Sequence, residues 1–200
     1  MNVVETTVQI DGLALSIVHP PDPVELIDED AFEQEEFLPY WAELWPSAVA
    51  LARQVATREV AERTVLELGC GLALPSIVAA SRGARVLATD WSPDALVFAR
   101  RNAERNGVQL ETELVAWACA GGVVARGPWS LVLAADVLYE RRNVEPLLRL
   151  LPLLGDEVLL ADPGRPALPA FLAAAAATWE IERRESPELP RGAIHGLCAR

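Results

Sequence analysis

The chain has 200 residues, of which 52% are hydrophobic, a composition that suits one folded domain and is not typical of a disordered protein. Its formal net charge of −12 argues against a nucleic-acid partner, because such a partner requires a basic face. The longest apolar run near the C-terminus, residues 167–179, is broken by Pro169 and is too short to span a membrane, so no membrane partner is expected.

The first 38 residues are predicted to form an extension of the main domain, which covers residues 39–200. Residues 6–10 alternate between polar and apolar side chains, Asp11-Gly12 supplies a turn, and residues 13–18 return, which is the pattern of a β-hairpin. Residues 22–36 contain eight acidic residues and no basic one. Such a segment is either a solvated stretch or an acidic lip that attracts a cationic substrate.

From residue 39 onward, short apolar strands alternate with amphipathic helices. This alternation predicts an α/β fold with a parallel sheet that is covered by helices on both faces. We expect helices at residues 46–62, 73–82, 93–106, 144–154 and 166–177, and strands at residues 64–68, 85–89, 108–115, 130–135, 157–161, 179–185 and 194–200.

The most informative segment is the turn that follows the strand at residues 64–68. Gly69 and Gly71 stand one residue apart between this strand and the next helix. Two glycines at such a turn expose backbone amides and a helix N-terminus to a ligand, as in nucleotide-type cofactor sites. The dinucleotide fingerprint requires a third glycine where Leu74 stands, so an NAD-linked oxidoreductase is the weaker interpretation.

Three acidic residues indicate the kind of cofactor. Asp90 ends a strand about 20 residues past the glycine turn, where an acid can accept both hydroxyls of a ribose, although it could also be a turn residue. Glu67 lies in an apolar strand end, and its burial requires a cationic ligand or a helix N-terminus nearby, unless it is a capping or surface carboxylate. Asp136 follows the strand at 130–135, at the edge where parallel sheets bind ligands. Three carboxylates around one crevice favour a sulfonium such as S-adenosylmethionine over a pyrophosphate.

Four segments carry a resemblance to a known family: residues 39–48 (PYWAELWPSA), 67–75 (ELGCGLALP), 89–91 (TDW) and 135–139 (ADVLY). Together they resemble the class I, seven-strand methyltransferases that use S-adenosylmethionine, and more narrowly methyltransferase family sixteen, the protein-lysine methyltransferase-like group. The likeness runs from about residue 39 to residue 145. It implies a Rossmann-like, doubly wound sheet of seven strands, mostly parallel with an antiparallel last strand, next to the N-terminal hairpin.

The resemblance also implies roles for particular residues. Asp136 and Tyr139 match the family's Asp-x-x-Tyr motif; we expect Asp136 to orient an acceptor amine and Tyr139 to hydrogen-bond the substrate or line the pocket. Without the resemblance, ordinary core aromatics remain an alternative interpretation of Trp41 and Trp45. The residues expected to bind S-adenosylmethionine are Trp45, Glu67, Gly69, Cys70, Gly71, Asp90, Trp91, Trp117 and Ala135.

The resemblance implies an N-methyltransferase that acts on a protein lysine, which also fits the acidic block at residues 22–36. A small amine, such as a nicotinamide-like nitrogen, fits the same pocket chemistry, and a catalytically silent cofactor-binding protein is a further alternative. Residues 136–139 (DVLY) lack the Asn/Asp-Pro-Pro-aromatic signature of enzymes that methylate adenine or glutamine amides, so a nucleic-acid substrate is not expected. The sequence indicates no oligomeric state.

Three cysteines, Cys70, Cys119 and Cys198, stand far apart without the spacing of a metal site, so no metal is expected. No basic and apolar leader opens the chain. We therefore expect reduced thiols and a cytoplasmic location.

Overall fold

The computed structural model describes residues 2–22 and 39–200. The predicted acidic segment, beyond Asp22, lies outside the described residues, and so does the predicted boundary between residues 38 and 39.

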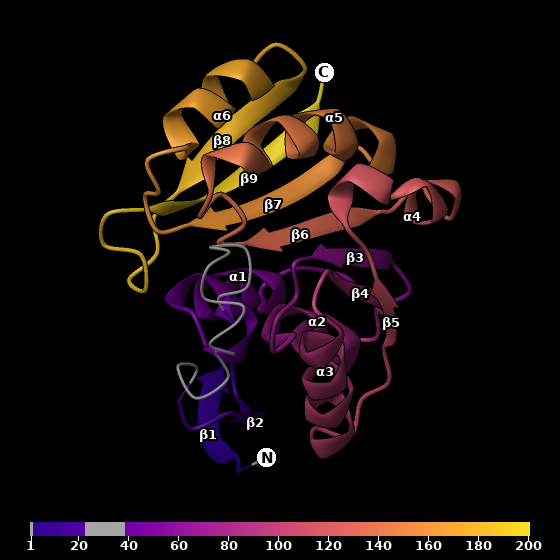
Figure 1. The fold of residues 1–200 in the computed structure, drawn as a ribbon, viewed down its shortest axis with the longest axis vertical. Coiled ribbons are helices and arrows are strands. Elements are labelled where there is room, and N and C mark those ends of the chain that lie inside the picture. Colours follow the sequence, from indigo (N-terminus) through magenta and orange to yellow (C-terminus); the bar gives the residue numbers. More distant parts are fainter. Residues whose placement is uncertain (1, 23–38) are drawn as a thin grey trace, which may run out of the picture.

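Seven strands form one sheet in the order β5-β4-β3-β6-β7-β9-β8 (Figure 1). The pairs among β3 to β7 are parallel, whereas β9 runs antiparallel to both β7 and β8. The predicted fold class is therefore confirmed, and the antiparallel last strand, β9, lies between β7 and β8. The strands are β3 (Thr64–Leu68), β4 (Arg85–Asp90), β5 (Glu111–Leu114), β6 (Leu131–Ala135), β7 (Glu157–Asp162), β8 (Trp179–Arg184) and β9 (Ala193–Ala199).

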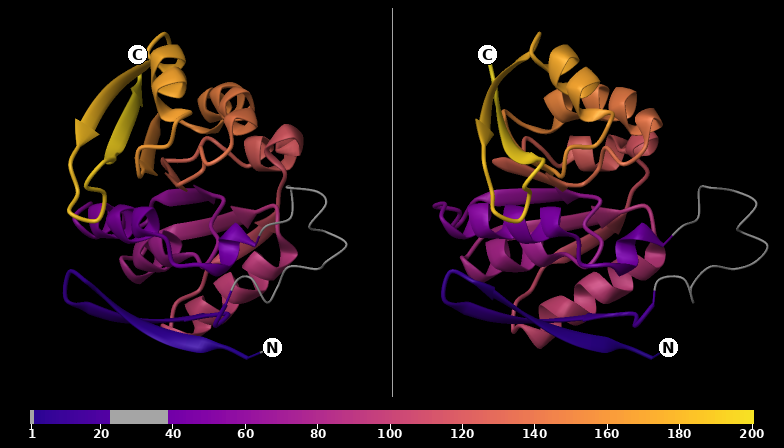
Figure 2. Two further views of the ribbon diagram at one scale, coloured as in Figure 1. Left: turned by 60° about the vertical axis from the view of Figure 1, so that its left-hand side comes forward. Right: turned by 90° about the vertical axis from the view of Figure 1, so that its left-hand side faces the viewer.

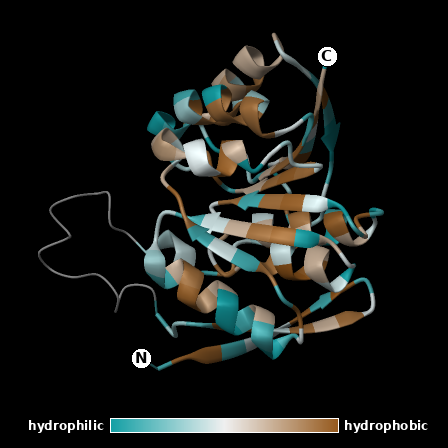
Figure 3. Cartoon of the chain, turned by 90° about the vertical axis from the view of Figure 1, so that its right-hand side faces the viewer, coloured by the Kyte–Doolittle hydropathy of each residue, from teal (hydrophilic) through white to brown (hydrophobic). Residues whose placement is uncertain are grey.

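Helices cover both faces of this sheet, because alternate residues of the central strands are buried on opposite sides. Val65 and Leu131 pack in the core beneath the first helices, and Leu66 and Val132 pack in the core beneath the later ones. Figure 3 shows that the central strands are largely hydrophobic. The first face carries α1 (Pro46–Ala56), α2 (Leu74–Ser81) and α3 (Pro93–Arg105), and the second carries α4 (Gly121–Ala125), α5 (Val144–Leu154) and α6 (Leu168–Ala175).

The helix predicted over residues 46–62 ends earlier, at Ala56. The hydroxyl of Thr57 donates to the carbonyl of Gln54, and the chain then turns, with Glu62 in the left-handed region at φ 60°. Val60, whose spacing suggested a longer helix, is instead buried as a loop residue. Three short 3₁₀ turns, η3 (Tyr40–Ala42), η4 (Trp117–Cys119) and η5 (Arg141–Asn143), were not predicted.

The predicted N-terminal hairpin consists of β1 (Val4–Ile10) and β2 (Leu13–His19), which pair antiparallel. The hairpin packs against α3, which it crosses at an angle in both views of Figure 2. The side chain of Asn102 in α3 accepts from the N–H of Val18 at 2.8 Å and donates to its carbonyl at 3.2 Å. Ile10 and Ile17 are fully buried in the same core as α1 and α2, so the hairpin is packed into the domain.

No helix within residues 2–22 and 39–200 is long and apolar enough to cross a membrane.

Candidate active site

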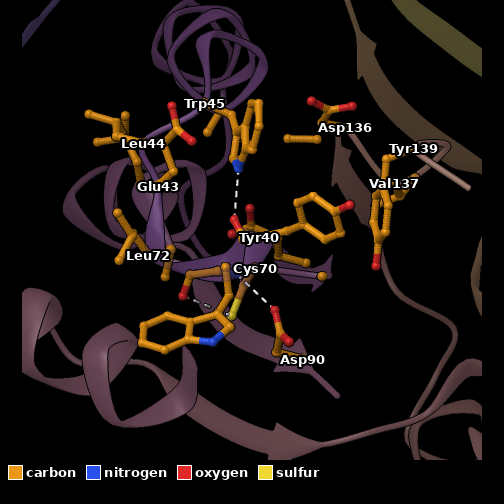
Figure 4. Close-up of a pocket in the computed structure, with 18 of the residues that line it drawn as sticks. Tyr40, Glu43, Leu44, Trp45, Cys70, Leu72, Asp90, Asp136, Val137 and Tyr139 are labelled. Carbon is orange, nitrogen blue, oxygen red and sulfur yellow. Dashed lines mark hydrogen bonds between the residues drawn. The ribbon is translucent and has the colours of Figure 1, made fainter. Parts of the chain in front are cut away.

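A pocket lies at the carboxyl ends of β3, β4 and β6, where the chain enters its helices and turns (Figure 4). Every residue predicted to bind the cofactor or to act in catalysis lines it. Figure 4 shows Asp136 and Tyr139 on one side of the pocket and Asp90 and Cys70 on the other. The lining also includes residues that were not predicted as part of the site, namely Tyr40, Trp41, Glu43, Leu44, Ala48, Leu72, Ala73, Leu74, Val137 and Arg165.

The glycine turn forms a floor of bare backbone. Gly69 and Gly71 have φ values of 64° and 49°, in the left-handed region that glycine adopts without strain. A Cβ added at Gly71 would lie 3.2 Å from the carbonyl oxygen of Trp41, and one at Gly69 would lie 3.4 Å from Val137. A side chain at either position would therefore crowd Trp41 or Val137, which both line the pocket.

Asp90 stands at the end of β4, and the residue is 4% exposed. Its Oδ2 accepts the N–H of Gly71 and its Oδ1 accepts the N–H of Ser92, both at 2.9 Å. Burial raises the pKa of Asp90, and the backbone hydrogen bonds oppose that rise. Each carboxylate oxygen accepts more than one hydrogen bond, so Asp90 retains capacity for the two hydroxyls of a ribose.

Glu67 is also buried, but its partner is the N-terminus of α2. Its Oε2 accepts the N–H of Ser76 at 3.0 Å and the hydroxyl of the same residue. Burial raises the pKa of Glu67 from 4.5 to about 8, so the group is mostly neutral near pH 7. Of the two partners that its burial required, the structure supplies the helix terminus. Glu67 still lines the pocket, as expected, but it is held by the protein and not by a ligand.

The carboxylate of Asp136 is not open either. It accepts Nε of Arg165 at 2.7 Å through Oδ1 and Nη2 of Arg165 at 2.8 Å through Oδ2. The guanidinium also lies over the ring of Trp45, 5.6 Å from its centroid. The sequence reasoning missed Arg165. The available signal was its place just after β7, the strand beside β6, because neighbouring parallel strands end at the same edge of the sheet.

Arg165 is the only basic side chain among the described residues that line the pocket, and Asp136 matches its charge. No unpaired basic group on this lining faces a phosphate. The lining therefore still disfavours a pyrophosphate. The reason is that it offers no unpaired cation, whereas the sequence argument rested on three carboxylates around the pocket.

Two tyrosines form an aromatic wall beside Asp136. The rings of Tyr40 and Tyr139 are 5.0 Å apart at an angle of 47°. Burial raises the pKa of Tyr139, so its hydroxyl stays protonated at neutral pH. The indole N–H of Trp45 donates to the carbonyl of Tyr40 at 2.7 Å, whereas Trp41 packs against Phe98 as a core aromatic.

Glu43 is a further residue that the sequence reasoning missed. It is exposed, it lines the pocket, and its carboxylate makes no hydrogen bond or ion pair in the part of the chain that the structure describes. Glu43 thus offers an open negative charge to a cationic ligand. Among the described residues, no group of His, Cys, Asp or Glu side chains could hold a metal ion.

This strand order, with a ligand pocket at the carboxyl ends of its central strands, is the class I methyltransferase fold. The solved 16S rRNA N2 G1207 methyltransferase of T. thermophilus shares it, with a TM-score of 0.68 at 14% identity, over 99% of this chain and 51% of that one. A family model described as lysine methyltransferase matches residues 31–161, and the chain belongs to this family.

Two curated relatives illustrate the range of the family. The electron transfer flavoprotein beta subunit lysine methyltransferase of Xenopus laevis is 36% identical over 64% of this chain and 53% of its own length. The human histone-arginine methyltransferase METTL23 is 32% identical over 52% of this chain and 58% of its own length. The chain thus spans about half the length of these relatives.

Proposed function

We propose that the protein transfers a methyl group from S-adenosylmethionine to a lysine side chain of another protein. The main support for the proposal is the geometry at the end of β3 and β4, where the glycine turn at Gly69 and Gly71 is hydrogen-bonded to the buried carboxylate of Asp90. The one basic side chain among the described lining residues, Arg165, is already paired and leaves no cation for a phosphate. Membership in the lysine methyltransferase family supports it.

The chain's own residues would hold this cofactor in a fixed pose. The turn at Gly69 to Gly71 would lie under its methionine and ribose, and Asp90 would accept the ribose hydroxyls. The aromatic rings of Trp91 and Trp117 would flank the adenine, and Trp45 and the backbone of Ala135 would contact the methionine part. When bound, S-adenosylmethionine supplies a methyl group activated by a sulfonium.

The other side of the pocket suits an amine on a long apolar stem. Tyr40 and Tyr139 present ring faces against which such a stem or its cation can pack. Glu43, exposed at the pocket, would attract the cation. Catalysis here would rest on holding the amine in line with the methyl group.

A protein arginine is the second candidate acceptor, because relatives named as histone-arginine methyltransferases match the chain as well. A small-molecule amine has less support, since these relatives are named for protein substrates. The net charge of −12 weighs against a nucleic acid.

The decisive experiment incubates the purified protein with cell extract and labelled S-adenosylmethionine, followed by mass spectrometry of the products. We expect methyl-lysine in a protein fraction. These 200 residues contain no lysine, so methyl-lysine cannot come from modification of this chain itself. Methyl-arginine would favour the second candidate, and label confined to small molecules would contradict both.

We also propose that the protein acts in the cytoplasm. The three free cysteines support a reducing compartment, because none of them is paired.

A further inference from the structure

The acceptor side of the pocket is built around a fixed ion pair. Asp136 is 7% exposed, has a left-handed backbone at φ 55°, and accepts hydrogen bonds from Nε and Nη2 of Arg165. Arg165 is fixed in turn, because Oδ1 of Asp162 accepts the N–H groups of Gly164 and Arg165, each at 2.7 Å. Its guanidinium packs over Trp45. The pair is thus fixed by three elements: Asp136 follows β6, Arg165 lies in the turn after β7, and Trp45 precedes α1.

The pair changes what an amine meets at Asp136. An ammonium that approaches this carboxylate also approaches the guanidinium of Arg165, which has the same charge. A like charge within a few ångströms disfavours the protonated form of an amine and lowers its pKa. Methyl transfer needs the neutral form, because the nitrogen lone pair makes the new bond.

The other ionisable groups around this place do not replace the pair. Asp162 directs one oxygen to backbone N–H groups behind Arg165. Tyr40 and Tyr139 carry phenol groups, Asp90 and Glu67 are bonded to the turns on the opposite side, and Glu43 is exposed. Glu140, which acts on Tyr139, is paired with Arg142, and Arg191 lies in the neighbouring groove. Among the described residues that line the pocket, Asp136 and Arg165 are thus the one pair of opposite charges in direct contact.

We infer that Arg165 is a positioning residue that fixes Asp136 and makes the acceptor end of the pocket select a neutral amine over an ammonium. This inference rests on the proposed function. The ammonium loses its proton to water, its nitrogen then bonds to the methyl carbon, and the carbon–sulfur bond breaks with its electron pair left on sulfur. The nitrogen carries a full positive charge as an ammonium but only a partial positive charge during methyl transfer. The guanidinium of Arg165 therefore repels the bound ammonium more strongly than the reacting amine.

The first test measures binding of n-butylamine, an analogue of the lysine side chain, which is protonated at pH 7.5. Tryptophan fluorescence or calorimetry follows its binding to the protein saturated with S-adenosylhomocysteine. We expect Arg165→Gln to bind it about tenfold more tightly, because Asp136 is released and the repelling charge is gone. Asp136→Asn is expected to bind it more weakly, because Arg165 is left unmatched.

Two variants serve as controls for charge and for general damage. Arg165→Lys keeps the positive charge and should retain the weak binding of the unmodified protein. Arg101→Gln removes an exposed arginine of α3 that does not line the pocket, and it should leave binding unchanged. Weaker binding by Arg165→Gln, or changes of the same sign in Arg165→Gln and Asp136→Asn, would overturn the inference. So would the absence of n-butylamine binding in every variant.

The second test is the pH dependence of kcat and KM with the acceptor identified by labelling. For Arg165→Gln we expect a lower KM, a lower kcat at neutral pH, and an acid limb displaced by about one pH unit toward alkaline pH. An equal loss of kcat at every pH would instead show a merely structural role. If Arg165→Gln does not fold, the contrast between Arg165→Lys and Asp136→Asn decides. If no variant transfers methyl groups but the binding contrast holds, the proposed function fails and the selection by charge stands.

Discussion

The backbone N–H of Gly71 donates to Oδ2 of Asp90 at 2.9 Å and so joins the turn after β3 to the end of β4. The second oxygen of Asp90 accepts from Ser92 in the turn that follows. One buried carboxylate therefore holds two turns in register and, in the proposed function, also holds the ribose.

We expect Asp90→Asn to reduce both affinity for S-adenosylhomocysteine and stability. The amide of asparagine places a donor opposite one of the two backbone N–H groups, which costs about 1–3 kcal/mol. Calorimetric titration should show at least a roughly tenfold loss of affinity, and chemical denaturation should show the loss of stability. Asp94→Asn, at an exposed position in the first turn of α3, is the matched control. Full affinity in folded Asp90→Asn would place the ribose elsewhere.

Gly71→Ala should lose cofactor affinity, and Gly107→Ala should not. Both glycines have positive φ, at 49° and 67°, so each alanine incurs about 1–2 kcal/mol of backbone strain. The added Cβ at Gly71 meets Trp41, whereas the one at Gly107 has nothing within 4 Å. Titration of both variants with S-adenosylhomocysteine separates the effect of backbone strain from the effect of crowding against Trp41. Equal affinity in the two variants would contradict the placement of the cofactor on this turn.

Glu67→Gln should stabilise the protein at alkaline pH. The folded pKa of Glu67 is raised to about 8 from 4.5, so the folded state holds a proton that the unfolded state releases between these values. The stability that this group contributes is present below pH 4.5 and is lost as pH rises through about 8. The variant should therefore exceed the parent by a few kcal/mol, in order of magnitude, at pH 9, and by much less at pH 5.

Denaturant unfolding at both pH values measures this difference. Glu180→Gln, at an exposed position on β8, should show no such trend. A stability gap that does not depend on pH would contradict the raised pKa of Glu67.

Glu43→Gln should raise the KM for a cationic protein acceptor and leave kcat nearly unchanged, because its charge acts on approach rather than on transfer. The effect should shrink as ionic strength rises. Steady-state kinetics at two salt concentrations measures it, with Glu59→Gln, exposed and outside the pocket, as the control. A fall in kcat that is insensitive to salt would argue against this role.

The sheet, the glycine turn and the strand-end residues were predictable from the sequence because their signals are local. The apolar run at residues 64–68, the paired glycines and the spacing to Asp90 each lie within a short window. The 3₁₀ turn at Tyr40–Ala42 has no such signal, because three residues show no periodicity. The predicted helix was too long because Val60 is apolar and buried, although it lies in a loop after α1.

The electrostatics of the site were less predictable than its location. Asp136 and Arg165 are 29 positions apart in the sequence. Their contact depends on the turns after β6 and β7, which bring the two side chains together. Likewise, the partner of Glu67 is decided by where α2 begins relative to β3. Carboxylates could be placed at one sheet edge from the sequence, but which of them remained charged and open required the structure.

The amide of Asn102 reaches in two directions, since it binds both polar groups of Val18 in β2 and also donates to the carbonyl of Leu72 at 3.2 Å. The N-terminal hairpin is thereby linked through Asn102 to the loop at Leu72, which lines the pocket. Removal of the hairpin would remove both hydrogen bonds between Asn102 and Val18. No residue of β2 lines the pocket, so the hairpin supports the pocket loop from outside, through Asn102.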